Sequence, residues 1–300
     1  MDHALAGNHG RLIAVLGDSR GGSLRTWLLV GLPTAFLLIF FVAPTAYLFS
    51  ASVLLSEGLM TPGAPTLENY HLLLSRSLYQ SIILRSFGIG IGVGLVVVLL
   101  SYPVAYFLVR TTSRWKGLLI AVTLSPLLAS VIVRTYGWYV ILNQEGALNG
   151  LLLATGLVEQ PLRFLPSTAA IIVGLAHALL PYGVLSIMSS LNGMNPALER
   201  AAMSLGATRF RTFLRVTLPL TMPGVTGGFL LAFSLAISAY ATPAILGGPA
   251  TETMATTIRN FMVVLLDWGL GSAMGVILLA SSLLLLLLGT LAGGKRAAAA

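Results

Sequence analysis

The sequence is dominated by six apolar stretches, each long enough to cross a lipid bilayer as a helix. A spanning helix needs about 20 mostly apolar residues. Apolar residues make up 56% of the chain and charged residues only 9%, whereas soluble domains carry roughly 25% charged residues. This pattern predicts an all-α polytopic membrane protein with six transmembrane helices. The predicted spans are residues 27–55, 82–109, 118–142, 168–190, 224–246 and 270–291.

Positive charges are distributed unequally between the segments that connect these spans. The segments on one side, with both termini, carry twelve Lys and Arg residues, and those on the other side carry three. Such an excess marks the cytoplasmic side of a membrane protein. We therefore expect the tails 1–26 and 292–300 and the connection 195–219 to be cytoplasmic. The same asymmetry accounts for the net charge of +8 without a nucleic-acid partner.

Residues 195–219 form the longest polar interruption after the N-terminal tail and contain their own helix signals. Asn195-Pro196 is typical of a helix start, because an Asn side chain caps the helix and a first-turn proline loses no hydrogen bond there. Gly206 supplies the left-handed residue that ends a helix. Thr208 can cap a second short helix, which Leu218-Pro219 is expected to close at the mouth of the next span. The segment therefore predicts a helix–turn–helix elbow outside the membrane.

The spacing within this elbow resembles the signature of ABC-importer permease subunits. That signature is E-A-A, three residues, Gly, nine residues and then I-x-L-P. Here Ala201-Ala202, Gly206 and the run Val216–Pro219 occupy the matching positions without a gap. In that family the elbow is the coupling helix, which docks into a groove of the cytoplasmic ATPase. The alternative is an ordinary basic cytoplasmic loop that contains a helix.

One position of the elbow departs from the family pattern. Arg200 stands where the family has glutamate, and Glu199 precedes it by one residue, so the face on which the acidic group lies is open. The resemblance implies that the elbow residues around the signature contact the ATPase. These candidates are Glu199, Arg200, Ala201, Ala202, Leu205, Gly206 and Ala207.

Arg134 and the aromatic residues near it are candidates for the substrate path. Arg134 lies about 17 residues into the third predicted span, roughly 25 Å from the cytoplasmic face at 1.5 Å per residue. A charge at that depth must reach outward, pair or line a wet cavity. Aromatic faces and carboxylates suit an alkylammonium group, although an aromatic belt that anchors a helix end is the alternative. The candidates are Arg134, Tyr136, Trp138, Tyr139, Tyr240, Asp267 and Trp268.

The resemblance covers roughly residues 65–282 and narrows to one subfamily. The runs Arg134–Trp138 and Asp267–Gly269 resemble the spermidine/putrescine-type permeases in particular. The resemblance implies a type I ABC importer permease fold that forms half of a path for a polyamine or a related organic cation. Permeases for phosphonate, iron or an amino-acid-like amine share much of the pattern and remain alternatives.

The same resemblance implies the partners and the location of the chain. It predicts a second homologous permease subunit, a dimer of cytoplasmic ABC ATPases and a periplasmic solute-binding protein, all assembled at the bacterial inner membrane. ATP and Mg would be bound by the ATPase, so we expect no cofactor, no metal site and no catalytic residue in this chain.

Several other classes of protein fit the sequence less well. The chain has no cysteine, which excludes disulfides and thiolate metal sites. An ion-coupled secondary transporter predicts charged relays within the spans, where only Arg134 and His177 stand out. A scaffold or sensor predicts a sizeable soluble domain, and no connection is long enough for one. We expect His177 to bond to a backbone carbonyl freed by Pro181, with a proton relay as the alternative.

Overall fold

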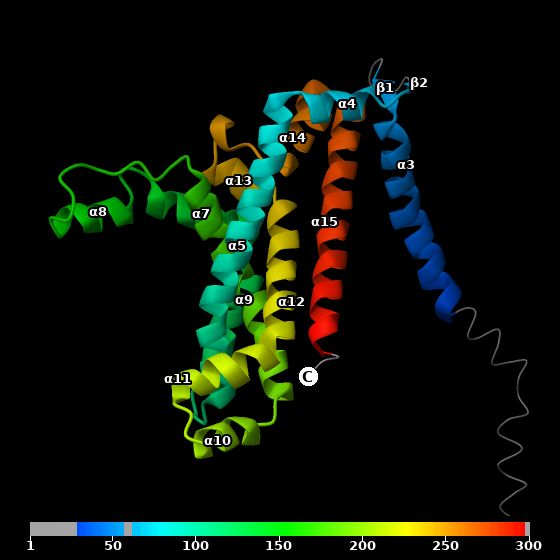
Figure 1. Cartoon of the computed structure of the whole chain (residues 1–300). Helices are drawn as coiled ribbons and strands as arrows, with labels where there is room; N and C mark the ends of the chain where they lie inside the picture. Colours follow the sequence, from blue (N-terminus) through cyan, green and yellow to red (C-terminus); the bar gives the residue numbers. More distant parts are fainter. Residues whose placement is uncertain (1–28, 57–61, 298–300) are drawn as a thin grey trace, which may run out of the picture. The chain divides into compact units, whose positions relative to one another are not determined.

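The computed structural model describes residues 29–56 and 62–297 (Figure 1). The predicted N-terminal tail, residues 1–26, lies outside the described residues. The chain divides into two compact units, residues 1–51 and 52–300. Apart from one small pair of strands, the regular elements of the described residues are helices, which confirms the predicted all-α class.

The first unit contains an apolar helix that the structure describes as Leu29–Ser52. It includes a π-helical turn, η1 (Leu38–Val42), followed by α3 (Ala43–Ser52). The N–H of Ala43 bonds to the carbonyl of Leu38, five residues back. Pro44 follows this turn, and a proline has no N–H and crowds the carbonyl four residues before it. The wider turn gives that carbonyl room, so the helix continues through the proline.

The second unit is built on three long helices that pack against one another: α5 (Ser77–Arg110), α9 (Thr168–Gly193) and α12 (Leu218–Ile237). The helix α15 (Trp268–Ala297) packs along α12. The α5 residues Ile89, Val93 and Val97 are at most 2% exposed and recur every four residues, so one face of α5 lies in the core. Large apolar side chains also cover its outer face, as expected of a helix that crosses a membrane.

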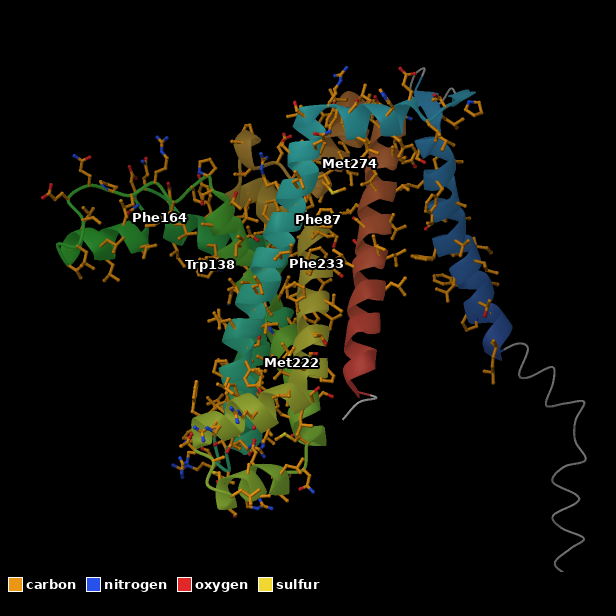
Figure 2. All side chains as sticks on the ribbon, in the orientation of Figure 1. Phe87, Trp138, Phe164, Met222, Phe233 and Met274 are labelled. Atoms are coloured by element: carbon orange, nitrogen blue, oxygen red, sulfur yellow. The ribbon has the colours of Figure 1, made fainter. Side chains whose placement is uncertain are left out.

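Small residues set the spacing between these helices. Gly90 and Gly94 of α5 lie one turn apart and face α12. A Cβ atom at Gly90 would overlap the Cγ2 atom of Ile237 and lie 2.8 Å from Cε2 of Phe233, and one at Gly94 would lie 2.7 Å from Cδ2 of Phe229. Figure 2 shows Phe233 among the side chains of α12 in this part of the bundle. Close helix approach through paired small residues is typical of membrane helices.

Two of the predicted spans are not single helices. Residues 118–142 become α6 and α7, and the apolar segment Val131–Ala154 leaves Lys116–Leu128 at an angle of 98°. Residues 224–246 become α12 and α13, separated by a break at 238–240. The bounds are α6 Lys116–Leu128, α7 Val131–Leu142, α8 Ala147–Ala154 and α13 Ala241–Leu246. The described residues hold five helices long and apolar enough to span a membrane, or six if the bent pair is one span.

The remaining elements lie at the two ends of the second unit. Figure 1 shows α10 and α11 at one end of the bundle and α4 and α14 at the other. The strands β1 and β2 form an antiparallel pair. The bounds are β1 Leu54–Ser56, β2 Pro62–Pro65, α4 Glu68–Ser75, α10 Ala197–Ser204, α11 Arg209–Thr212, η2 Phe213–Thr217, η3 Pro249–Thr251, α14 Met254–Arg259 and η4 Asn260–Leu265.

The glycine contacts on α5 predict opposite effects for two neighbouring substitutions. Gly90→Ala should destabilise the protein by about 1–3 kcal/mol because the core is already filled at that point. Gly88 has open space around its Cβ position, so Gly88→Ala should be neutral or stabilising by up to about 1 kcal/mol through helix propensity. Thermal unfolding of both purified variants checks this. Equal melting temperatures would show that Gly90 does not set the contact between α5 and α12.

Candidate coupling elbow and translocation path

The elbow folds as its local sequence predicts. The side-chain oxygen of Asn195 accepts a hydrogen bond from the N–H of Ala197 at 2.9 Å, where α10 begins. Gly206 follows the end of α10 with φ of +89°, a conformation that glycine adopts without strain. The hydroxyl of Thr208 accepts a hydrogen bond from the N–H of Arg211 at 3.3 Å and caps α11. These contacts confirm the predicted two-helix elbow.

The elbow presents most of its candidate docking residues to the surroundings. Arg200, Ala201 and Gly206 are exposed, and Leu205 is 89% exposed. The partly buried candidates are Ala202, Ala207 and Glu199. The carboxylate of Glu199 is directed inward, 2.8 Å from the guanidinium of Arg110. The charge that α10 offers outward is therefore the cation of Arg200.

The sequence predicts that the second helix of the elbow ends at Leu218-Pro219. In the structure this helix instead runs on into the next span. The helix is continuous from Arg209 to Ile237. The π turn η2 precedes the proline, and the N–H of Leu218 bonds to the carbonyl of Phe213, five residues back. As at Pro44, the wider turn accommodates a residue that lacks an N–H and would crowd a normal turn. The elbow and α12 are thus joined by unbroken helix.

A cavity of about 520 Å³ lies where the two broken spans meet. Its lining comes from the break between α6 and α7, the break between α12 and α13, and the facing side of α9. Non-helical backbone at membrane depth is tolerated only where it is buried in protein or lines a wet cavity. The hydroxyls of Thr135 and Thr242 lie 3.1 Å apart and link α7 to α13 beside this cavity. This cavity is the best candidate in the described residues for part of a translocation path.

Arg134 and Tyr240 are the two candidate path residues that the structure brings together, because both line this cavity. The guanidinium of Arg134 also donates a hydrogen bond to the carbonyl of Pro126. That carbonyl belongs to the last turn of α6, where a cation meets the negative end of the helix dipole. The expected depth of Arg134, roughly 25 Å from the cytoplasmic face, assumed an unbroken helix. The 98° bend invalidates that distance.

The aromatic candidates of α7 lie apart from this cavity lining. The indole N–H of Trp138 donates a hydrogen bond to Nδ1 of His177 at 3.2 Å. The sequence predicted that His177 bonds to a carbonyl freed by Pro181, but the structure links its imidazole to α7. Figure 2 labels Trp138 on α7. Tyr136 and Tyr139 pack edge to face against each other, with ring centroids 6.3 Å apart. These contacts brace α7 and leave the predicted path role of the three aromatic residues untested.

Asp267 and Trp268 lie at the start of α15. The chain reverses at Leu266, which has a left-handed φ of 56°. The side-chain oxygen Oδ1 of Asp267 then accepts a hydrogen bond from the N–H of Leu270 at 2.9 Å. This is the geometry of an N-cap, and the carboxylate also meets the positive end of the helix dipole. Trp268 is 42% exposed. The structure thus gives Asp267 a local role in starting the helix.

Three residues of this region were not among the sequence-based candidates. Tyr182 and Thr242 line the cavity, and the guanidinium of Arg259 lies 5.9 Å from the ring centroid of Tyr240, within the range of a cation–π contact. Arg259 and Tyr240 also share a second, more polar pocket of about 290 Å³ with Glu252. The sequence carries no local signal for these residues, since their proximity depends on the breaks in the spans.

Comparison with known proteins identifies the class to which this architecture belongs. The second unit is a bundle of long apolar helices with a capped elbow at one end. Residues 118–294 match the family described as binding-protein-dependent transport system inner membrane component. The chain belongs to this family and is a permease subunit of an ABC importer at the inner membrane.

Individual relatives cover most of the chain. It is 32% identical over 213 residues to the spermidine/putrescine transport system permease protein PotB of Escherichia coli (strain K12), covering 71% of this chain and 77% of that protein. The PotB protein of Haemophilus influenzae is 32% identical over 241 residues, covering 80% and 84%. Among solved structures, a bacterial ABC transporter involved in the import of the acidic polysaccharide alginate matches with a TM-score of 0.72 at 18% identity, covering 90% of this chain and 96% of that chain. That structure supports the fold alone.

Two substitutions at Asp267 separate a capping role from a role of its charge. Asp267→Asn retains a good N-cap, whereas Asp267→Ala loses it at a cost of about 1 kcal/mol. If capping is the role of Asp267, the Asn variant should keep the thermal stability and transport of the parent protein, and the Ala variant should melt earlier. Thermal unfolding and substrate uptake in vesicles measure both. A stable Asn variant that has lost uptake would instead place the charge on the substrate path.

Proposed function

We propose that the elbow 195–219 docks on a separate cytoplasmic ATPase and couples ATP hydrolysis to movement of the spans. The observation that carries this proposal is the unbroken helix from Arg209 to Ile237, which joins an exposed surface to a core helix. A displacement of the elbow would be passed to α12 as a rigid-body movement. ATP and Mg would be bound by the ATPase, and this chain would contribute one elbow and half of the path.

The exposed surfaces of the second unit support further partners. The segment α7–α8 carries many exposed apolar side chains, among them Val133, Val140 and Leu151 at 63–70% exposure. Within the bilayer such a surface is compatible with a second permease subunit as well as with lipid. In this arrangement both termini and the elbow face the cytoplasm, in agreement with the positive-inside rule. The opposite end, with α4 and α14, would meet a periplasmic solute-binding protein.

We infer a polyamine as the leading substrate class. The support is the identity to spermidine/putrescine permeases over 71% to 80% of the chain. In the cavity between the broken spans, the only charged side chain among the described lining residues is Arg134. A guanidinium repels ammonium groups in a site of low dielectric. The carboxylates that neutralise a polyamine would therefore come from the second permease subunit or from the binding protein.

Arg134 also favours a second candidate function, import of an anionic solute by the same mechanism. A cation that lines a cavity together with two tyrosines and apolar side chains suits a carboxylate or another oxyanion, to which an arginine makes strong paired hydrogen bonds. The two candidates differ only in substrate class. They share the elbow, the ATPase and the path.

A substrate titration decides between these two candidates. The complete transporter, reconstituted with its ATPase and binding protein, would be titrated with spermidine, putrescine and a dicarboxylate of similar length. The polyamine proposal predicts that ATP hydrolysis rises with the first two compounds and is unchanged by the third. Stimulation by the dicarboxylate alone would exclude polyamines and support the anionic candidate.

A glycine in the elbow tests the coupling role itself. Gly206→Asp forces a side chain into the left-handed region, at a cost of about 1–2 kcal/mol, and adds a carboxylate to the docking surface. We expect stimulation of ATP hydrolysis by substrate to fall about fivefold or more, the lower end of typical coupling between sites.

Gly193→Asp is the matched control for this variant. Gly193 lies at the end of α9 with open space around it, so the same charge is added near the elbow without a change in its turn. We expect this control to keep its stimulation. A Gly206→Asp variant that assembles and couples like the parent protein would contradict the proposed role of the elbow.

A further inference from the structure

The carboxylate of Glu199 joins three separate parts of the second unit. Its Oε2 atom lies 2.8 Å from Nη2 of Arg110, the last residue of α5. Its Oε1 atom accepts a hydrogen bond from the hydroxyl of Thr217 at 2.7 Å, at the end of η2. One side chain of α10 therefore forms an ion pair with the end of α5 and a hydrogen bond with η2, within the helix that continues into α12.

The surroundings make the loss of this contact more costly than the loss of an ordinary surface ion pair. The side chain of Glu199 is 14% exposed and that of Arg110 is 26% exposed, while Thr217 is 1% exposed. The guanidinium of Arg110 also lies 5.7 Å from the ring centroid of Tyr106, one turn earlier on α5, which favours one position of the cation. A partly desolvated pair with a further hydrogen bond loses more on disruption than an exposed pair does.

We propose that Glu199 is a positioning residue, which holds the coupling elbow against the inner ends of α5 and α12 and does not itself contact the ATPase. The proposal rests on the proposed function of the elbow. It explains why the acidic residue stands one position before the glutamate of the family signature. On α10, a shift of one residue turns the side chain by about 100°, from the docking face to the face that packs on the bundle. Arg200 then occupies the docking face.

The contacts of Glu199 affect how a displacement of α10 is transmitted to α5 and α12. The continuous helix from Arg209 to Ile237 links α11 to α12 through the backbone, whereas the backbone between α10 and α11 passes through the turn at Gly206. The bonds of Glu199 add a second link, from α10 directly to α5 and η2. With both links in place, a displacement of α10 moves α5 and α12 together.

A charge swap tests this role in the full-length chain. The variants are Glu199→Arg, Arg110→Glu and the double variant that carries both changes. The matched control combines Glu199→Arg with Arg114→Glu. It has the same net charge as the double variant, but Arg114 stacks on Trp115 at 5.4 Å and is not the partner of Glu199 in the structure. Size-exclusion chromatography establishes which variants are folded and monodisperse.

Two measurements read the outcome. The first is stimulation of ATP hydrolysis by substrate in the reconstituted transporter. The second is the mobility of a nitroxide attached at Leu205→Cys in the permease chain alone in lipid nanodiscs, which is straightforward because the chain has no cysteine of its own. The second measurement does not involve the ATPase. It therefore tests the contact of Glu199 even if the elbow were to have no coupling role, a failure that Gly206→Asp reveals separately.

We expect each single variant to lose about tenfold in stimulation, equivalent to about 1.4 kcal/mol of coupling, and to show a more mobile nitroxide. The double variant should recover most of both properties, and the matched control should recover neither. Recovery in the double variant identifies an ion pair within this chain. If Glu199 instead contacted the ATPase, a glutamate at position 110 could not replace it. A folded double variant that recovers neither property would overturn the proposal.

Glu199→Gln keeps the test decisive if the swapped variants do not fold. The amide keeps the shape of the side chain and an oxygen for the hydroxyl of Thr217, but toward Arg110 it replaces the charged acceptor with an uncharged N–H donor. We expect the nitroxide to be more mobile than in the parent chain and the stimulation of ATP hydrolysis by substrate to be lower. A spectrum and a stimulation identical to those of the parent protein would contradict the proposal.

Discussion

The need to satisfy every backbone hydrogen bond within a hydrocarbon layer governs this structure. Helices meet that need within a single segment, so the apolar stretches of the chain are helical, and breaks are tolerated only beside protein or water. The two breaks in the second unit, after α6 and after α12, both open onto the same cavity of about 520 Å³. Pro44 and Pro219 obey the same constraint, since π turns accommodate both without loss of the helix. The candidate path and the connection from elbow to span are both consequences of this constraint.

The elbow combines a rigid connection with a fixed attachment. The helix from Arg209 to Ile237 carries α11 into the core, and Glu199 bonds α10 to Arg110 and Thr217. Close helix contacts at Gly90 and Gly94 then join α5 to α12. The two ends of the bundle are thereby connected through packed helices, which is what a subunit needs if events at one end are to change access at the other.

Short-range signals in the sequence predicted the elbow well, and long-range contacts lay beyond them. Asn195, Gly206 and Thr208 act through neighbours within three or four residues, so their capping roles follow from local rules. The break after Leu128 has no such local signal. Pro126 lies just before it but inside α6, and prolines also lie inside α5 and α9, which do not break. The apolar composition on both sides of the break is also the same. The role of Asp267 as a cap was missed because the sequence suggested a substrate contact first. The partner of Glu199 could not be predicted, since Arg110 is distant in sequence and meets it only through the packing of α5.

The most direct test of the account measures movement at both ends of α12 in the complete transporter. One pair of nitroxides would be placed at Ala197→Cys, an exposed position at the start of α10, and at the matching elbow position of the second permease subunit, and another at Leu231→Cys of α12 and its counterpart. Distances would be compared between the nucleotide-free state and the state trapped with ADP and vanadate. If the elbow and α12 move as one rigid body, the two elbows should approach each other and the α12 distance should change in the same step. Elbows that approach while the α12 distance stays constant would contradict it.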